Sequence, residues 1–204
     1  MPPPPISERT SKLKVIRDQV FNLTASPLYI FRATNGYFPV IGEGNHEAEI
    51  MFIGEAPGKN EAQTGRPFCG AAGQVLDDLL ASINLPRAAV YVTNIVKDRP
   101  PQNRDPLPEE IAIYGPFLDR QIEIIQPKII ATLGRYSMQY IMPKFELGNL
   151  LRPISQIHGH LFEGKASYGA VKILPLYHPA ATIYNRELLV DLQTDFAKLK
   201  TYNL

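Results

Sequence analysis

The chain has 204 residues, of which 45% are hydrophobic and 20% are charged. This length allows one substantial core and is short for two domains, so we expect residues 1–204 to form a single domain, with residues 1–6 flexible. Lysine and arginine number 21 against 20 acidic residues. The resulting formal net charge of +1 excludes a strongly basic protein, so any contact with nucleic acid must come from a local patch.

Cysteine content and hydropathy indicate in which compartment of the cell the protein is expected. Cys69 is the only cysteine, which excludes an intramolecular disulfide and a metal site built from cysteines alone. We interpret it as a small buried hydrophobic side chain, because no basic partner can be assigned to it. No apolar run reaches the roughly 18 residues that a membrane span needs, and the residues after Met1 lack a secretion signal. We therefore expect a soluble, cytoplasmic, monomeric protein.

The hydrophobic pattern predicts helices and strands that alternate along the chain. The first helix is expected at residues 7–23, with Leu13, Ile16, Val20 and Phe21 on its buried side. Short β-rich apolar runs predict buried strands at residues 49–53, 90–96, 128–133 and 171–177. Amphipathic patterns predict helices at 71–83, 108–125, 136–142 and 186–202. This alternation predicts an α/β fold with a parallel sheet flanked by helices.

Polar side chains follow the carboxyl ends of three expected strands, where open α/β sheets bind their ligands. Glu55 follows the first strand, Asn94 lies in the second, and His178 follows the last. We therefore expect a carboxylate, a carboxamide and an imidazole to meet in one pocket. A nucleotide-phosphate loop is not expected, since Gly54–Gly58 and Gly159–Lys165 both depart from the required pattern and the second follows no clear strand.

Each of these side chains has a functional and a structural interpretation. Asn94 offers one acceptor and two donors, which match the imide edge of uracil, or it caps the loop that follows it. His178 can donate to an oxygen that gains charge as a bond breaks, or it is a structural histidine. Phe68 lies in a Gly-Pro-rich loop, where its ring either stacks on a nucleobase or belongs to the core.

Two further groups of residues have less specific patterns. Lys97, Arg99 and Arg104 lie in a proline-stiffened loop, which suits a DNA phosphate backbone or an ordinary solvated surface. His158 and His160 form an H-x-H pair, but no third metal ligand is visible nearby, so strand or loop polarity explains them better and no metal site is expected.

A set of motifs carries a family resemblance. GEAPGKNE, GRPFCGAAGQ, VYVTNIVKDRPPQNRDP, PKIIATLGR and LYHPAAT follow one another between about Tyr37 and Thr182. Together they resemble the motif set of the family 4 uracil-DNA glycosylases. The resemblance implies a three-layer fold with a central four-stranded parallel sheet flanked by helices. It also implies hydrolysis of the N-glycosidic bond of deoxyuridine in single- or double-stranded DNA, which releases uracil and leaves an abasic site.

The resemblance also implies roles for individual residues. Glu55 lies near the sugar and the attacking water, Glu61 crowds C5 of uracil, and Phe68 stacks on the base. Asn94 reads uracil, His178 donates to its O2 atom, and Asn103 supports the site or contacts DNA. Gly54 and Ala56 belong to the loop whose amides face the base.

The remaining DNA contacts are expected on two segments. Arg99 and Arg104 are expected to bind phosphates from the proline-rich loop. Ile183 or Tyr184 is positioned in sequence to fill the gap left by a flipped base, while Arg186 reaches a phosphate. The alternative is that Ile183 starts the core face of the last helix.

The chain departs from the family at the iron-sulfur ligands. Where the family usually has cysteines, this sequence has Leu23, Ser26, Asp98 and Tyr114. None of these side chains can replace thiolates in a four-cysteine site, so we expect no cluster and no other cofactor. Two alternatives to a uracil-excising enzyme remain: a DNA-binding module that recognises uracil or abasic sites without efficient excision, and a glycosylase acting on hypoxanthine or xanthine.

Overall fold

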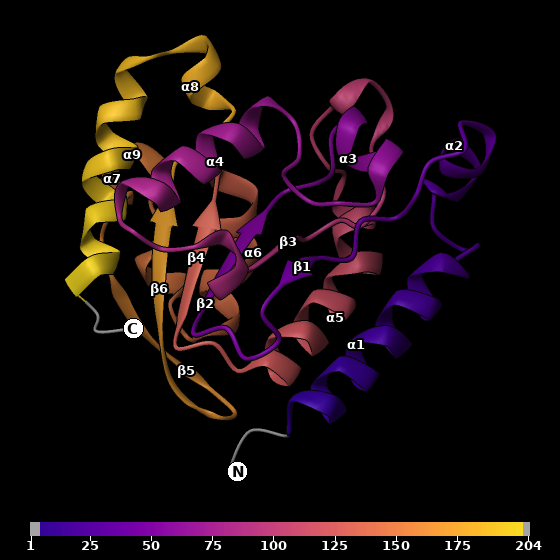
Figure 1. The fold of residues 1–204 in the computed structure, drawn as a ribbon, viewed down its shortest axis with the longest axis horizontal. Coiled ribbons are helices and arrows are strands. Elements are labelled where there is room, and N and C mark those ends of the chain that lie inside the picture. The colour runs from indigo at the N-terminus through magenta and orange to yellow at the C-terminus, as the bar shows by residue number, and fades with distance from the viewer. Residues whose placement is uncertain (1–4, 202–204) are drawn as a thin grey trace.

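The structure is a computed structural model that describes residues 5–201. Its centre is a mixed sheet with the strand order β1-β3-β2-β4-β6-β5 (Figure 1). The inner strands are β3 (Tyr91–Asn94), β2 (Ile50–Gly54), β4 (Ile129–Leu133) and β6 (Gly169–Leu176). Each is parallel to its inner neighbour. The predicted α/β class and the central four parallel strands are therefore confirmed.

Two antiparallel edge strands were not predicted from the sequence. β1 (Glu43–Gly44) pairs with β3, and β5 (Phe162–Ala166) pairs with β6. β1 has only two residues, and β5 has a mixed burial pattern with few fully buried positions. Neither segment therefore has the continuous apolar run by which the inner strands were recognised.

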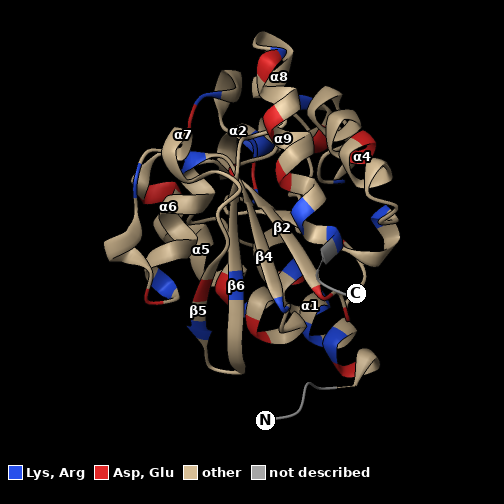
Figure 2. Cartoon of the chain, turned by 90° about the vertical axis from the view of Figure 1, so that its left-hand side faces the viewer, with Lys and Arg blue, Asp and Glu red and all other residues tan. Residues whose placement is uncertain are grey.

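Helices cover both faces of the sheet (Figure 2). On one face, α4 (Ala71–Ser82) and α9 (Glu187–Ala197) pack through Leu76, Leu79, Leu192 and Phe196 against alternate residues of the strands. On the other face lie α1 (Ile6–Phe21), α5 (Pro108–Ile125) and α6 (Arg135–Lys144). β2, β3 and β4 are buried on both faces, as is the second half of β6, which explains why these segments read as continuous apolar runs.

Short helices and turns complete the chain. The remaining α-helices are α2 (Tyr29–Thr34), α3 (Lys59–Thr64), α7 (Ile154–Ile157) and α8 (Ala181–Tyr184), and 3-10 turns occur at Arg87–Ala89, Pro101–Asn103, Gly148–Leu150 and Lys198–Thr201. No helix within residues 5–201 is long and apolar enough to cross a membrane.

Some expected boundaries were wrong. Ile6 already begins α1, and residues 1–4 of the segment expected to be flexible lie outside the described residues. Phe21 is 43% exposed instead of buried, because it ends α1 on a different side from Ile16 and Val20. The last helix ends at Ala197 and continues as a 3-10 turn, while Tyr202 lies outside the described residues.

Candidate active site

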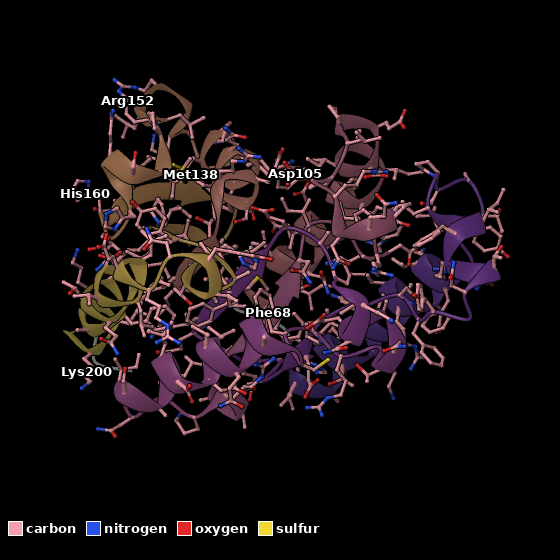
Figure 3. The ribbon with its side chains drawn as sticks, turned by 90° about the horizontal axis from the view of Figure 1, so that it is seen from above. Phe68, Asp105, Met138, Arg152, His160 and Lys200 are labelled. Carbon is pink, nitrogen blue, oxygen red and sulfur yellow. The ribbon has the colours of Figure 1, made fainter. Side chains whose placement is uncertain are left out.

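A cavity of about 580 Å³ opens at the carboxyl edge of the parallel strands. Glu55, Asn94 and His178 all line it, as expected from the strand ends. Phe68 and Asp105 line it from the segments before α4 and α5, and both are labelled in Figure 3. Topology brings these groups together, because the ends of β2, β3 and β6 lie at one edge of the sheet.

Asn94 ends β3 beside the floor of the cavity. It is only 2% exposed, and its Oδ1 atom has no hydrogen-bond partner. The loop-capping interpretation is therefore not supported for this oxygen. Gly54 is its neighbour on β2, and a Cβ there would overlap Asn94 Oδ1 and come within 2.7 Å of Cζ of Phe68. Glycine at residue 54 is thus needed for these two side chains to approach the strand.

Phe68 and His178 form a pair of rings in the wall of the cavity. Their centroids are 5.7 Å apart, with an angle of 26° between the ring planes. Phe68 is buried and has a φ of 48°, a left-handed conformation that is unusual for a bulky side chain. Strained backbone of this kind occurs often at ligand sites, where it aims a side chain that a relaxed loop would place elsewhere.

His178 is held as a neutral imidazole with a defined tautomer. The backbone N–H of Ala180 donates to Nδ1 of His178 at 3.1 Å. Nδ1 is therefore an acceptor, and the ring proton lies on Nε2. Burial lowers the pKa of His178 to about 4, although the charge of Glu61 opposes this shift. At neutral pH the ring is a hydrogen-bond donor without a positive charge.

The pKa of Glu55 is close to neutral pH, so both protonation states of its carboxyl group are populated there. Burial raises its pKa to about 7, and the charge of Asp105 adds to the effect, while the Tyr136 amide and the Arg135 charge oppose it. A Cβ on Gly134 would be 2.5 Å from Oε1 of Glu55 and 3.2 Å from Cβ of His178. Gly134 also has a φ of +97°, so glycine suits both the backbone and the crowded space here.

Asp105, Arg135 and Tyr136 form a polar group beside Glu55 that the sequence did not single out. Arg135 Nη2 and Tyr136 Oη donate to Oδ2 of Asp105 at 2.6 and 2.8 Å. The three residues come from the proline-rich loop and the first turn of α6. Two of the quoted motifs, PKIIATLGR and VYVTNIVKDRPPQNRDP, contain Arg135 and Asp105, but the sequence assigned no role to either residue.

Glu61 and Ala56 also line the cavity. Oε1 of Glu61 accepts hydrogen bonds from the backbone N–H groups of Cys69 and Gly70 at 3.0 and 2.8 Å. This carboxylate therefore connects α3 to the loop that carries Phe68.

The prediction that Cys69 is buried was wrong. Its side chain is exposed, because it points away from the core at the turn before α4.

In the proline-rich loop, the Arg99 and Arg104 side chains bind other groups of the protein. Arg99 donates to Oδ1 of Asn103 at 2.7 Å and to the Tyr37 hydroxyl at 3.0 Å. Arg104 makes a bidentate pair with the fully buried Glu110, at 2.9 and 2.6 Å. Asn103 and Arg104 line the cavity, whereas Arg99 does not.

Lys97 was grouped with these arginines as a cation for phosphate, and that prediction was wrong. Its side chain is fully buried, because it turns inward from the end of β3. It donates instead to oxygens of the protein interior.

Residues 183–186, which follow His178 after four buried or half-buried residues, are exposed. Tyr184 lines the mouth of the cavity and is 91% exposed, and its neighbour Ile183 is 52% exposed. Ile183 therefore does not start the core face of the last helix. Arg186 is also exposed and precedes α9, but it does not line the cavity.

Three of the four residues that stand where the resemblance implies cysteines, Ser26, Asp98 and Tyr114, form a hydrogen-bonded network. The Ser26 and Tyr114 hydroxyls are 2.6 Å apart, and Tyr114 donates to Oδ2 of Asp98 at 2.6 Å. Arg32 Nη1 lies 3.3 Å from the other oxygen of Asp98. Leu23 packs against the same core. Burial raises the pKa of Asp98, which Tyr114 and Arg32 oppose. These side chains do not fit an iron-sulfur cluster, which requires thiolate ligands.

The histidine pair has a structural explanation. Nδ1 of His158 lies 2.7 Å from Oδ2 of the buried Asp195, which joins α7 to α9. His160 is exposed at the edge of the molecule (Figure 3). Within the described residues, no group of histidine, cysteine and acidic side chains is arranged to hold a metal ion.

The protein thus has an α/β fold with a cavity at the carboxyl edge of its parallel strands, where proteins of this class bind ligands. The family model described as the uracil DNA glycosylase superfamily matches residues 41–202. A type-4 uracil-DNA glycosylase of Sulfurisphaera tokodaii is 46% identical over 189 residues, which cover 92% of this chain and 83% of the relative. The type-4 enzyme of Archaeoglobus fulgidus is 44% identical over 170 residues, covering 83% of each chain. That of Thermotoga maritima is 38% identical over 196 residues, covering 95% and 96%.

The chain therefore belongs to the uracil DNA glycosylase superfamily, among relatives of its type-4 group. This confirms the resemblance drawn from the sequence motifs.

Proposed function

We propose that this protein is a monofunctional uracil-DNA glycosylase of DNA repair, which hydrolyses the N-glycosidic bond of deoxyuridine and leaves an abasic site. Its substrate is uracil-containing DNA, single- or double-stranded, and it acts as a cytoplasmic monomer. Membership of the family supports the reaction.

One observation carries the choice of base: the unpaired Oδ1 atom of Asn94. A buried acceptor without a partner costs free energy unless a ligand supplies the donor. The N3–H group of uracil is such a donor, whereas N3 of cytosine is an acceptor and would face Oδ1 unfavourably. The carboxamide NH₂ group can in turn donate to a neighbouring carbonyl of uracil. Phe68 lies beside Asn94 and offers a ring for the base to stack on.

The reaction proceeds by loosening of the glycosidic bond of a flipped nucleotide. Charge develops on the departing uracil, and the Nε2–H of neutral His178 donates to its O2 atom. The sugar gains positive character at the same time, which the Glu55 carboxylate stabilises while it orients the attacking water. Both groups line the cavity, and neither forms a covalent bond to DNA. Lys59 at the start of α3 also lines the cavity, but the proposal assigns it no covalent step, so no lyase activity is included.

Contacts with the DNA surround the mouth of the cavity. Asn103 and Arg104 face it from the proline-rich loop, with Arg99 behind Asn103. Exposed Ile183 or Tyr184 enters the duplex in place of the flipped base, and Arg186 binds a phosphate beside it. Because Arg104 is already paired with Glu110, its main contribution is to hold the loop in place.

The protein functions without an iron-sulfur cluster. The network of Ser26, Tyr114, Asp98 and Arg32 supports this, since it satisfies its own buried polar atoms. It connects the segment after α1 with α2, with α5 and with the loop after β3, and so holds together four segments of the chain without a metal.

A single assay tests the function. Purified protein is incubated with end-labelled oligonucleotides that contain U, T, hypoxanthine or xanthine, as single strands and as duplexes, and abasic sites are cleaved with alkali. We expect strand breaks only with U, and Asn94→Ala should abolish them. Tight binding to uracil DNA without breaks indicates the non-catalytic module, and breaks at hypoxanthine or xanthine in place of uracil indicate the altered base range.

A further inference from the structure

Lys97 is a fully buried lysine directly behind Asn94. Its Nζ atom lies 2.6 Å from the backbone oxygen of Asn94 and 2.6 Å from Oε1 of Gln121 on α5. The third contact is with Oγ1 of Thr93 at 2.8 Å. The amine therefore links the end of β3, where Asn94 lies, to the helix that covers that face of the sheet.

The surrounding hydrogen bonds define the protonation state of this amine. The Thr93 hydroxyl donates to the carbonyl of Ile41 at 2.6 Å, so its oxygen is free to accept from Lys97. The Gln121 NH₂ group donates to the same carbonyl and to the Tyr91 hydroxyl at 2.9 and 3.1 Å, so its Oε1 also accepts. The nearest three partners of Nζ are thus acceptors.

An ammonium group has three N–H donors and matches these acceptors, whereas a neutral amine would leave its lone pair facing oxygens. Burial lowers the pKa of Lys97 well below its ordinary value. The three acceptors oppose that shift, because each stabilises the charged form. We take the ammonium as the state that satisfies every polar atom in the group.

The charge of this ammonium is not balanced by an acidic neighbour. Among residues 5–201 no carboxylate lies within ion-pair distance of Lys97, and that of the adjacent Asp98 is bonded to Tyr114 and Arg32. A buried, unpaired charge is costly to the fold. Its electrostatic effect is also large, because the protein interior screens charge weakly.

We infer that Lys97 is a positioning residue for uracil excision: its buried ammonium holds the Asn94 backbone and makes the uracil-binding end of the cavity electropositive. This inference rests on the proposed function. The cavity side of Asn94 receives the base, and the other side is bound by the ammonium. As the glycosidic bond breaks, the departing uracil gains negative charge, and the Lys97 charge favours that state over the neutral ground state.

The test compares two leaving groups in single-turnover excision. DNA containing 5-fluorouracil is the second substrate, because fluorine withdraws electrons and its anion needs less stabilisation. Lys97→Met should slow uracil excision at least about tenfold and slow 5-fluorouracil excision several-fold less. The matched control is Tyr91→Phe, which removes one hydrogen bond from the same group and leaves all three acceptors of Nζ in place. It should leave the ratio of the two rates unchanged.

A double variant and an NMR measurement keep the inference testable even if Lys97→Met does not fold. If Lys97→Met does not fold, the double variant Lys97→Met, Thr93→Val leaves fewer unpaired polar atoms and is measured in its place. In the unmodified protein, the ¹⁵Nζ chemical shift of Lys97 at neutral pH should be that of an ammonium.

The outcomes separate this inference from the proposed function. If the unmodified protein excises uracil but Lys97→Met slows both substrates equally, or if the ¹⁵Nζ shift is that of an amine, Lys97 has only a structural role and the inference is overturned. If the unmodified protein excises no uracil from any substrate, the proposed function itself fails.

Discussion

The backbone N–H of Ala180 donates to Nδ1 of His178, and this single 3.1 Å contact determines what the histidine can do. It places the ring proton on Nε2, and burial keeps the ring neutral at physiological pH. The residue is thus prepared as a donor before any substrate binds.

The first prediction concerns this donor. His178→Ala should lower the single-turnover excision rate by about 100-fold, while DNA binding falls much less, because the donor acts on charge that develops only in the transition state. The control is His158→Ala, which removes a histidine bonded to Asp195 elsewhere in the fold. It should reduce the melting temperature and leave the rate of the folded enzyme unchanged. Equal rates for His178→Ala and the parent would show that the assigned pocket is wrong.

The second prediction concerns the pH dependence of the rate. Glu55 has a pKa of about 7, and its ionised form is the one that stabilises the sugar cation. The single-turnover rate should therefore rise roughly tenfold between pH 6 and pH 8 and level off above that range. His178 does not titrate in this window, since its pKa is about 4. Glu55→Gln should be slow and should lack this rise; a slope that survives the substitution must come from another group.

The third prediction concerns stability at the same residue. The folded state raises the pKa of Glu55 from its ordinary 4.5 to about 7, so the folded state holds this proton more tightly than the unfolded chain. Stability is consequently lost as pH rises from 4.5 to 7, by up to about 3 kcal/mol. Glu55→Gln should raise the free energy of unfolding at pH 8 and change it little at pH 4. Urea unfolding at both pH values measures this difference, and an equal change at the two would contradict it.

The fourth prediction concerns the network of Ser26, Asp98, Tyr114 and Arg32. The protein should be colourless and free of stoichiometric iron, because its one cysteine cannot supply four thiolates. Tyr114→Phe removes the donor to buried Asp98 and should cost about 2 kcal/mol of stability. Tyr168→Phe is the control, since that hydroxyl makes a longer bond to the Pro127 carbonyl, 3.2 Å, and lies in a half-buried site. Broad absorbance near 400 nm together with bound iron would rule out the cluster-free proposal.

The fifth prediction concerns the exposed residues after His178. Replacing Ile183 and Tyr184 together with glycine should impair excision from U·A pairs most, from U·G pairs less, and from single strands least. A side chain that fills the gap matters in proportion to the pairing and stacking it replaces. Ile30→Gly on α2, where the side chain is 75% exposed, controls for the loss of an exposed apolar group. Equal losses on all three substrates, or a loss explained by a lower melting temperature, would argue against this role.

The sequence alone determined the central sheet and the order of its motifs. β2, β3, β4 and the second half of β6 are buried on both faces, and continuous apolar segments of that kind can be recognised from the sequence alone. Glu55, Asn94 and His178 were predicted to meet because parallel strands end at one edge, and they line one cavity. The absence of cluster cysteines was equally visible, since it is a matter of residue identity.

Only the tertiary structure decided how the charged and polar side chains are used. Lys97 and Arg104 look alike in sequence, yet one is buried behind Asn94 and the other is paired with Glu110 from α5. The unpaired oxygen of Asn94 and the raised pKa of Glu55 likewise depend on neighbours that are distant along the chain. Burial, desolvation and hydrogen-bond partners are properties of packed segments, so a local pattern identifies which group is present but not which state it adopts.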